Sequence, residues 1–556
     1  MRKLTLIAMA ALLLVCTQCK KNDATQSTKT IQITFTPSDN GGLRTSFDPA
    51  EGSFSWTEGE CIFVGGSNHT ECLGVLTSVG SGDDTTFEGE IAQPEEGETI
   101  HFFYLGNGKD GSEVPTELDF SMQNGQNVTN YHVARGSAIY DGTSTSFSAQ
   151  LDMLVSFAYF NLSAFKDGNG FKENVYLHGE AVYSKATVNY SDGTITGTPG
   201  FINLGKAING GGYYALIPQS TPSGTTLKFD SNSKTGAMDF LRGVDAGKLY
   251  RTSAGEALVP TMGELRENAG GLFSVSDTKM VRLAKSNLQY ARTSTATDWA
   301  DGTWSFMTNP WDYVETTGTI SDEYEDQTTI SLFGWGTAGN HMAYYGRYYY
   351  PWATANTQDV SELQYGPRNS TSSLIGEFAN GDWGINNNGS LGGEQPSWRV
   401  LTKDEWLYLF GMTENNQDNE GHKRYQKYGR ARVSAQTQSS GIIIVPDDFN
   451  DPENNQNSAY GEFVGGTDTE WESNYYNGLV NWNQMDKAGA IFLPIGGYRD
   501  GAEVHVWHQA AFYQSSTVYN GNFAHQLRFS SNSVDPANHT YRRYIGMNVR
   551  LVMDLD

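Results

Sequence analysis

The sequence predicts a mainly β protein in which two β-sandwich domains are followed by an α+β domain. A chain of 556 residues is too long for one small core. Its 62 glycines and 12% aromatic residues accompany short alternating apolar runs that end at Gly, Asn, Asp or Ser, a pattern typical of strands joined by tight turns. Clear helix signals gather in one segment, residues 399–410. We therefore expect sheets throughout, with one well-formed helix in the last domain.

The net charge of the chain excludes some classes of binding partner. The formal net charge is −26, so the chain should repel the phosphate backbone of nucleic acids and anionic lipid surfaces. No apolar run after the N-terminus is long enough to span a bilayer. We expect no nucleic-acid partner, and contact with a membrane only through a lipid anchor.

The first 18 residues have the pattern of a signal peptide. Arg2 and Lys3 precede a short apolar run and then small and polar residues. Cys19, in CTQCKKND, resembles the first residue of lipoproteins from Bacteroides-type bacteria. This resemblance implies a lipid on Cys19, a polar tether over residues 19–30 and a place on the outer membrane at the cell surface. Cys16 as the lipid site, or an ordinary cleaved signal, are the alternatives.

Residues 31–256 contain a series of predicted strands, the first of which alternates with period two. Ile31, Ile33 and Phe35 point to one face of the first strand, which Pro37 is expected to end. Further strands are predicted at residues 54–56, 61–64, 99–105, 151–162, 213–217 and 226–229. Because no helical pattern intervenes, we predict two sandwiches, at residues 31–135 and 136–256.

Two cysteines remain in this part of the chain. Cys61 and Cys72 flank CIFVGGSNHTEC, which predicts two strands joined by a turn. An exported compartment is oxidising, so a disulfide across the hairpin is one expectation and two buried thiols are the other. No partner stands at a zinc-type spacing, so we expect no metal here.

Three segments carry a family resemblance. The chain resembles fimbrillin-like proteins in three places: residues 43–64, which include the step from Trp56 to Gly59, residues 186–199 and residues 245–251. This implies a surface or pilus-related lipoprotein that is not an enzyme. In polymerising fimbrillins a protease cuts after an arginine near the start and frees a groove for a neighbour's strand. Arg44 is the candidate for that cut, and a solvated loop arginine is the alternative.

After a linker at residues 257–271, the domain at residues 272–556 is organised around the helix. Thr402 and Glu405 have the spacing of a capping box, and an apolar stripe follows from Trp406 to Phe410. Short apolar strands are expected within residues 441–449 and 489–501, and alternating strands close the chain.

This domain resembles the Fibrobacter succinogenes major paralogous domain and, more distantly, formylglycine-generating enzymes and C-type lectins. The matching residues lie at 271–275, 287–290, 332–336, 399–406, 445–448, 492–499, 515–516 and 549–552. The resemblance implies a C-type-lectin-like α+β fold. The family usually has a Trp before its serine pair, where this chain has Gln514; Phe512 or Tyr513 would substitute for it in a core.

The residue pattern does not indicate catalysis. The cysteine chemistry of formylglycine-generating enzymes is excluded, because no cysteine follows Cys72. Six histidines are scattered without a motif: His341, His422, His505, His508, His525 and His539. Asp447 and Asp448 are either a carboxylate pair or caps of a turn. We expect no enzyme activity and no cofactor.

Ligand binding is the remaining function class. The acidic stretches at residues 321–327 and 447–455 could supply oxygens to calcium, but neither has a fixed ligand spacing, and solvated loops are the alternative. An aromatic segment could stack on sugar rings or pack in a loop-rich core. Its members are Tyr344, Tyr345, Tyr348, Tyr349, Tyr350 and Trp352. We expect function in the loops of residues 299–383 and 498–520.

These observations predict a cell-surface adhesin or a pilus-associated tip or accessory protein. Its last domain would present a ligand surface to a host or dietary glycan or protein, and pilus subunits would be further partners. The alternative is a glycan-capturing lipoprotein of a polysaccharide uptake system.

Overall fold

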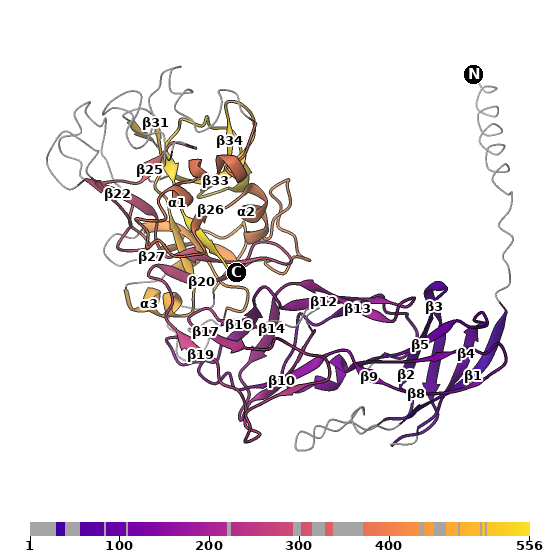
Figure 1. Cartoon of the computed structure of the whole chain (residues 1–556). Helices are drawn as coiled ribbons and strands as arrows, with labels where there is room; N and C mark the ends of the chain where they lie inside the picture. The colour runs from indigo at the N-terminus through magenta and orange to yellow at the C-terminus, as the bar shows by residue number, and fades with distance from the viewer. Residues whose placement is uncertain are drawn as a thin grey trace, which may run out of the picture. The chain divides into compact units, whose positions relative to one another are not determined.

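The computed structural model shows a mainly β protein, as predicted, folded into two compact units (Figure 1). It describes residues 29–38, 56–82, 85–106, 109–218, 224–292, 302–313, 329–336, 338, 371–433, 439–449, 463–475, 479–500, 503–505 and 509–555. Unit 1 comprises Met1–Leu118, Val128–Val155 and Ala186–Thr196, and unit 2 comprises Asp119–Asn127, Ser156–Lys185 and Gly197–Asp556. None of the described helices is long and apolar enough to cross a membrane.

Unit 1 is built on an eight-stranded sheet with the order β8-β1-β4-β3-β2-β5-β7-β9. Its strands are β1 (Thr30–Ser38), β2 (Cys61–Gly66), β3 (His69–Ser78), β4 (Phe87–Ala92), β5 (Thr99–Leu105), β7 (Val133–Ile139), β8 (Ser146–Gln150) and β9 (Asp152–Met153). β5 has the predicted bounds. Pro37 does not end β1, because it continues the parallel register with β8 opposite Ala149.

The core of unit 1 forms because this sheet curls. The rings of Phe35 on β1 and Phe102 on β5 stack with centroids 4.1 Å apart. Three strands separate β1 from β5 in the sheet, which would place them roughly 19 Å apart if the sheet were flat. Trp56 fills the same core with edge contacts to Phe87 and Tyr104. The expected sandwich in this unit is therefore one sheet folded over its own apolar face.

The long apolar run at residues 151–162 was expected to form one strand, and this prediction was wrong. The chain forms β9, then a break, then β10 (Ser156–Phe160). β9 pairs with β7 in unit 1, whereas β10 pairs with β15 (Gly212–Leu216) in unit 2. Apolar composition cannot reveal such a break, because both strands bury apolar side chains.

The first part of unit 2 packs two sheets around one core, which is a sandwich. Their orders are β15-β10-β18 and β14-β11-β16-β17-β19, and a further sheet has the order β13-β12-β6. The strands of the two sandwich sheets, besides β10 and β15, are β11 (Asn174–His178), β14 (Ile202–Lys206), β16 (Thr225–Asp230), β17 (Thr235–Phe240), β18 (Leu249–Tyr250) and β19 (Thr261–Gly263). The strands of the further sheet, β6 (Glu117–Asp119), β12 (Tyr183–Asn189) and β13 (Thr194–Pro199), contain residues of both units, and a short helix, η1 (Val128–Tyr131), belongs to unit 1. Phe160, Leu177, Tyr214 and Phe229 meet in the core between the two sheets. The segment expected as a linker contains β19, which pairs with β17.

The C-terminal region, residues 272–556, adds five sheets to unit 2. Their orders are β20-β21-β37-β26, β23-β22-β24, β25-β36-β33-β34-β35, β29-β27-β28-β30 and β31-β32. The strands are β20 (Ala269–Ser274), β21 (Met280–Ala284), β22 (Leu288–Arg292), β23 (Gly302–Phe306), β24 (Thr329–Ile330), β25 (Leu332–Phe333), β26 (Trp398–Val400), β27 (Tyr428–Val433), β28 (Ser439–Ile444), β29 (Asn474–Tyr475), β30 (Ile491–Pro494), β31 (Tyr498–Asp500), β32 (Glu503–His505), β33 (Ala510–Val518), β34 (Ala524–Ser530), β35 (Val534–Asn538), β36 (Met547–Asn548) and β37 (Leu551–Asp554). The helices are η4 (Gly376–Gly381), α1 (Trp383–Asn386), α2 (Lys403–Leu409) and α3 (Leu479–Lys487).

The predicted capping box is confirmed at α2. Thr402 caps the helix by accepting a hydrogen bond from the Glu405 N–H, and the Glu405 side chain accepts one from the Thr402 N–H. Trp406 is fully buried, and its indole Nε1 donates to the backbone carbonyl of Gln514 at 3.1 Å. Gln514 is buried too, and its side chain donates to the carbonyl of Phe333. The position that usually holds a Trp in the resembling family is therefore a core position in this chain.

Candidate functional site

Several predicted site residues lie outside the described part of the chain. These are Cys19, Arg44, Tyr344, Tyr345, Tyr348, Tyr349, Tyr350 and Trp352, together with His341, His508 and the acidic stretch at residues 321–327. They remain predictions. Among the residues that the structure does describe, no three His, Cys, Asp or Glu side chains gather as a metal site.

The expected disulfide is absent, because Cys61 and Cys72 are both free thiols. Cys61 on β2 lies opposite Thr77 on β3, so five residues of β3 separate Cys72 from that position. At about 3.4 Å per residue the offset is roughly 17 Å, far beyond the reach of a disulfide. Cys61 is buried and Cys72 is half-buried. Burial raises the pKa of both thiols, so neither is an activated nucleophile.

Asp447 and Asp448 do not form a free carboxylate pair. Asp447 makes an ion pair with Arg424, and it also accepts hydrogen bonds from the N–H and the hydroxyl of Ser274. Burial alone would raise the pKa of Asp447, but Arg424 and Ser274 outweigh it and hold the pKa below its ordinary value. Asp448 accepts a hydrogen bond from the Tyr176 hydroxyl. Both carboxylates are therefore occupied in structural contacts rather than placed for proton transfer.

Two of the scattered histidines meet at the turn between β33 and β34. Tyr519 in this turn stacks on His539 with ring centroids 4.0 Å apart, and His525 lies edge-on to both rings at 5.4 and 5.6 Å. We call these three residues the hairpin cluster. Tyr519 keeps 49% of its surface exposed, and His539 is exposed as well. The cluster therefore offers aromatic surface to solvent.

His525 is the half-buried member of the hairpin cluster. His525 Nδ1 lies 2.9 Å from the carbonyl oxygen of Ala537, and since a carbonyl only accepts, Nδ1 must carry the proton. Burial lowers the pKa of His525, so its ring is neutral at pH 7. A neutral ring whose Nε2 is an acceptor, beside an exposed phenol, suits a ligand with hydroxyl groups.

A second aromatic group lies at the β31–β32 hairpin. Tyr498 contacts His505, Phe512 and Tyr541, with ring centroids 4.9–5.1 Å apart. Phe512 is buried beneath Tyr498 and Tyr541, which are half-buried. The predicted region at residues 498–520 thus supplies Tyr498 and Tyr519. Tyr541 was missed, and His539 was named only as one of six histidines without a motif. Both follow β35, and only the tertiary fold brings them to Tyr498 and Tyr519.

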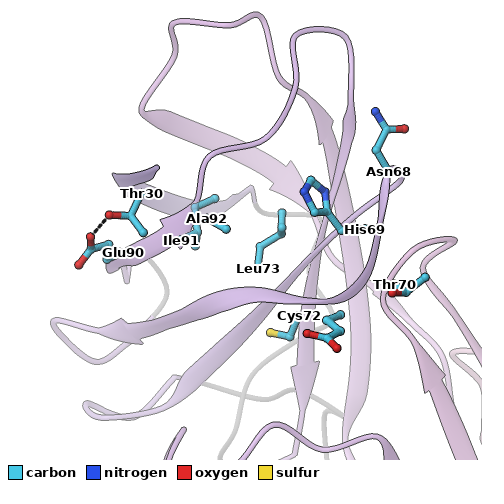
Figure 2. Close-up of a pocket in the computed structure, with 10 residues that line it drawn as sticks. Thr30, Asn68, His69, Thr70, Cys72, Leu73, Glu90, Ile91 and Ala92 are labelled. Carbon is cyan, nitrogen blue, oxygen red and sulfur yellow. Dashed lines mark hydrogen bonds between the residues drawn. The ribbon is translucent and has the colours of Figure 1, made fainter. Parts of the chain in front are cut away.

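A groove of about 720 Å³ opens in unit 1 where β3 extends past the end of β4 (Figure 2). It is lined by Thr30, Asn68, His69, Thr70, Glu71, Cys72, Leu73, Glu90, Ile91 and Ala92. Leu73 and Ile91 are buried and form its apolar floor, whereas Glu71 and Glu90 are exposed at its rim. No pattern in the sequence predicts this groove, because it arises where β3 continues beyond the end of β4.

One end of the groove is held by Glu98. Its carboxylate accepts hydrogen bonds from the Asn68 N–H at 3.0 Å, the Glu95 N–H at 2.8 Å and the His69 imidazole at 2.8 Å. Burial would raise the pKa of Glu98, but these donors offset it and the pKa is lowered. Glu98 therefore fixes the turn before β3, while Glu71 and Glu90 remain at the open side.

Neither a protein-family model nor a curated protein matches the sequence. Among solved structures, one named for cell adhesion from Bacteroides uniformis shares 14% identity with this chain, covering 42% of it and 97% of the other chain with a TM-score of 0.27. A fimbrial assembly protein from Parabacteroides distasonis shares 10% identity over 46% of this chain and 95% of its own, with a TM-score of 0.22. The tip fimbrial protein Mfa3 from Porphyromonas gingivalis shares 12% identity over 42% and 92%, with a TM-score of 0.21. Scores this low establish neither a common fold nor a common function.

Proposed function

We propose that this protein is a lipid-anchored cell-surface adhesin, non-enzymatic, whose C-terminal region binds a glycan through the hairpin cluster. The observation that carries the proposal is the exposed stack of Tyr519 and His539 with the neutral His525 beside it. Sugar rings stack on aromatic faces through their C–H groups, and imidazole and phenol groups hydrogen-bond to sugar hydroxyls.

The position of the cluster supports this role. Its residues come from the β33–β34 turn and from the segment after β35, and β33 is the central strand of its five-stranded sheet. His525 lies on β34, and the rings of Tyr519 and His539 pack on it and on each other, so the three rings lose little conformational freedom when a ligand binds. A surface site on a rigid sheet also agrees with the export signal and the lipid site expected at Cys19.

A glycan array with the full-length chain tests the proposal. We expect Tyr519→Ala and His539→Ala each to lose about 1 kcal/mol or more of binding, roughly fivefold or more in affinity. Tyr159→Ala is the matched control, because Tyr159 stacks on Tyr213 at 4.4 Å in the sandwich of unit 2 and should not affect binding. Binding that survives loss of Tyr519 and His539 would reject the site, and release of any product from the glycan would reject the non-enzymatic role.

The range of ligands distinguishes the two biological roles. Binding to mucin and several host glycans supports an adhesin, whereas binding to a single dietary polysaccharide supports glycan capture for an uptake system. The variants test the binding site and the range of ligands tests the biological role, so the two are tested independently.

Pilus membership is a further part of the proposal. β1 lies between β4 and β8, and it ends six residues before Arg44. A cut after Arg44 would therefore free β1 from the chain that follows it. Mass spectrometry of the surface-extracted protein decides the matter: a first residue at position 45 supports polymerisation, and a mature form that begins at acylated Cys19 rejects the cut.

A further inference from the structure

The groove in unit 1 lies along a strand edge that no neighbour covers within the described residues. β4 pairs with β3 only from Gly74 to Ser78, and its last residue, Ala92, pairs with Thr30 on β1. Beyond that point no strand of the described part of the chain pairs with Thr70, Glu71 and Cys72 on the side of β3 that faces β4. Unpaired N–H and C=O groups of this kind are a template for an added strand.

The groove has the dimensions and polarity of a strand site. Leu73 and Ile91 supply an apolar floor on which alternate side chains of an added strand could rest. Figure 2 shows Thr30 and Glu90 at one side of the groove and His69 and Asn68 at the other, with Leu73 between them. An added strand would continue the line of β4, about 4.8 Å from β3 and antiparallel to it.

The charge at the rim of the groove determines which kind of strand can bind. Glu71 and Glu90 both stand at the rim, and Glu71 makes no ion pair within the described residues. The segments that make up unit 1 from residue 30 onward contain 19 Asp and Glu but only 3 Lys and Arg. Such an excess attracts cationic partners and rejects acidic ones.

We propose that the β3 edge of unit 1 captures an extended cationic segment of a partner protein by strand addition. The backbone of the segment pairs with Thr70–Cys72, its apolar side chains face Leu73 and Ile91, and its Lys or Arg side chains reach Glu71 and Glu90. This site is separate from the glycan surface of the C-terminal region, so it adds a second partner class to the protein. It requires no release of β1.

The test uses the full-length chain in mild detergent and two short capped peptides. One peptide alternates lysine with valine and the other alternates glutamate with valine. By fluorescence anisotropy we expect only the lysine peptide to bind, with an affinity that falls as salt rises. Hydrogen exchange should show new protection of the amides at residues 69–73.

A charge-reversal variant tests whether Glu71 and Glu90 determine the peptide preference. The double variant Glu71→Lys/Glu90→Lys should weaken the lysine peptide by about tenfold or more and admit the glutamate peptide. Glu58→Lys is the control: it reverses one carboxylate in the turn at the opposite end of the β2–β3 pair, half the charge change of the double variant, and should alter the affinity by less than about twofold.

Three outcomes would overturn the proposal. The double variant could bind the lysine peptide as the wild type does, or the protection could fall outside residues 69–73. Binding could also appear only in a chain that begins at Lys29, which would mean that residues 20–28, with Lys20 and Lys21, fill the groove themselves. The hydrogen-exchange readout on the wild type does not depend on whether the variants fold.

Discussion

Unit 1 and the C-terminal region differ in the balance of acidic and basic side chains. From residue 30 onward unit 1 contains 19 acidic and 3 basic side chains, whereas residues 272–556 contain 33 acidic and 19 basic ones. Six arginines of the C-terminal region are no more than 2% exposed: Arg282, Arg424, Arg430, Arg499, Arg543 and Arg550. The C-terminal region buries arginines that pair with carboxylates and backbone carbonyls, whereas the charged side chains of unit 1 are nearly all acidic and include the buried Glu60 and Glu98.

Arg550 illustrates the internal use. Its guanidinium donates to the carbonyls of Ala284, Lys285 and Phe492 and to Asn287 Oδ1. Arg282 in the same way pairs with Asp230 and donates to the carbonyls of Ser231 and Asn232, which ties β21 to the sandwich of unit 2. Irregular segments expose carbonyls that no strand pairs, and a buried arginine fork satisfies several of them at once. Because buried arginines stabilise this region, its aromatic loops are available for ligand binding.

The largest expected effect comes from removing one partner of a buried pair. Arg424→Leu leaves Asp447 as an uncompensated buried charge, so we expect a loss of about 3–5 kcal/mol in the stability of unit 2. Arg432→Leu on the neighbouring strand β27 is the control, since its pair with Glu472 is solvent-exposed and should contribute at most about 1 kcal/mol. Denaturant unfolding measures both. Equal losses would contradict the distinction between internal and surface charge.

The next effect is a difference in the size of the pH dependence of stability. Burial would raise the pKa of Asp230, but Arg282 and His178 lower it to about 2, below its ordinary value of 3.8. The stability that Asp230 contributes is therefore complete above pH 3.8 and is lost as the pH falls toward 2, about 2 kcal/mol in all. In unit 1, hydrogen bonds from Ser144 and Thr143 lower the pKa of Asp141, and the donors at Glu98 lower its pKa despite burial, so acidification costs stability there as well. Relief of repulsion among the other carboxylates offsets part of this loss, so unit 1 should lose less stability than unit 2.

Hydrogen exchange at several pH values separates the two units, with β5 reporting on unit 1 and β16 on unit 2. Asp230→Asn should flatten the dependence seen at β16. Destabilisation of both units with the same slope would show that the charge contrast has no energetic consequence.

A smaller effect is expected at the helix cap. Thr402→Ala removes the hydroxyl that accepts from the Glu405 N–H and should cost about 1 kcal/mol. Thr402→Ser keeps an accepting hydroxyl and should stay near the wild type. Chemical unfolding of the two variants gives the comparison. A loss in Thr402→Ser as large as in Thr402→Ala would mean that the methyl group, and not the cap, matters.

The smallest effect is the response to salt. Raising ionic strength should stabilise unit 1 by less than about 1 kcal/mol, since screening weakens repulsion between exposed carboxylates. The buried pairs of the C-terminal region should scarcely respond. Exchange rates in β5 and in β30, measured at low and physiological salt, test this contrast, and an equal response in both strands would count against it.

Local signals predicted the local structure well. The spacing of Thr402 and Glu405 predicted the cap of α2, alternation predicted β1, and the apolar run at residues 99–105 predicted β5, because these patterns depend on neighbours in the chain. The disulfide expectation failed because the strand register, which sequence spacing does not reveal, separates Cys61 from Cys72. Tyr519 lay within the predicted loops, but its contact with His539 depends on how β35 returns beside β34. The groove depends on where β4 stops, which no residue pattern marks.

Hydrogen exchange of the full-length chain with a pool of mucin glycans tests the central claim most directly. The claim is that glycan recognition belongs to the aromatic hairpin cluster of the C-terminal region and not to the acidic surface of unit 1. We predict protection in the β33–β34 turn around Tyr519 and in the segment that holds His539, with residues 69–73 unchanged. Protection confined to unit 1, or none in the turn under conditions where glycan is bound, would contradict it.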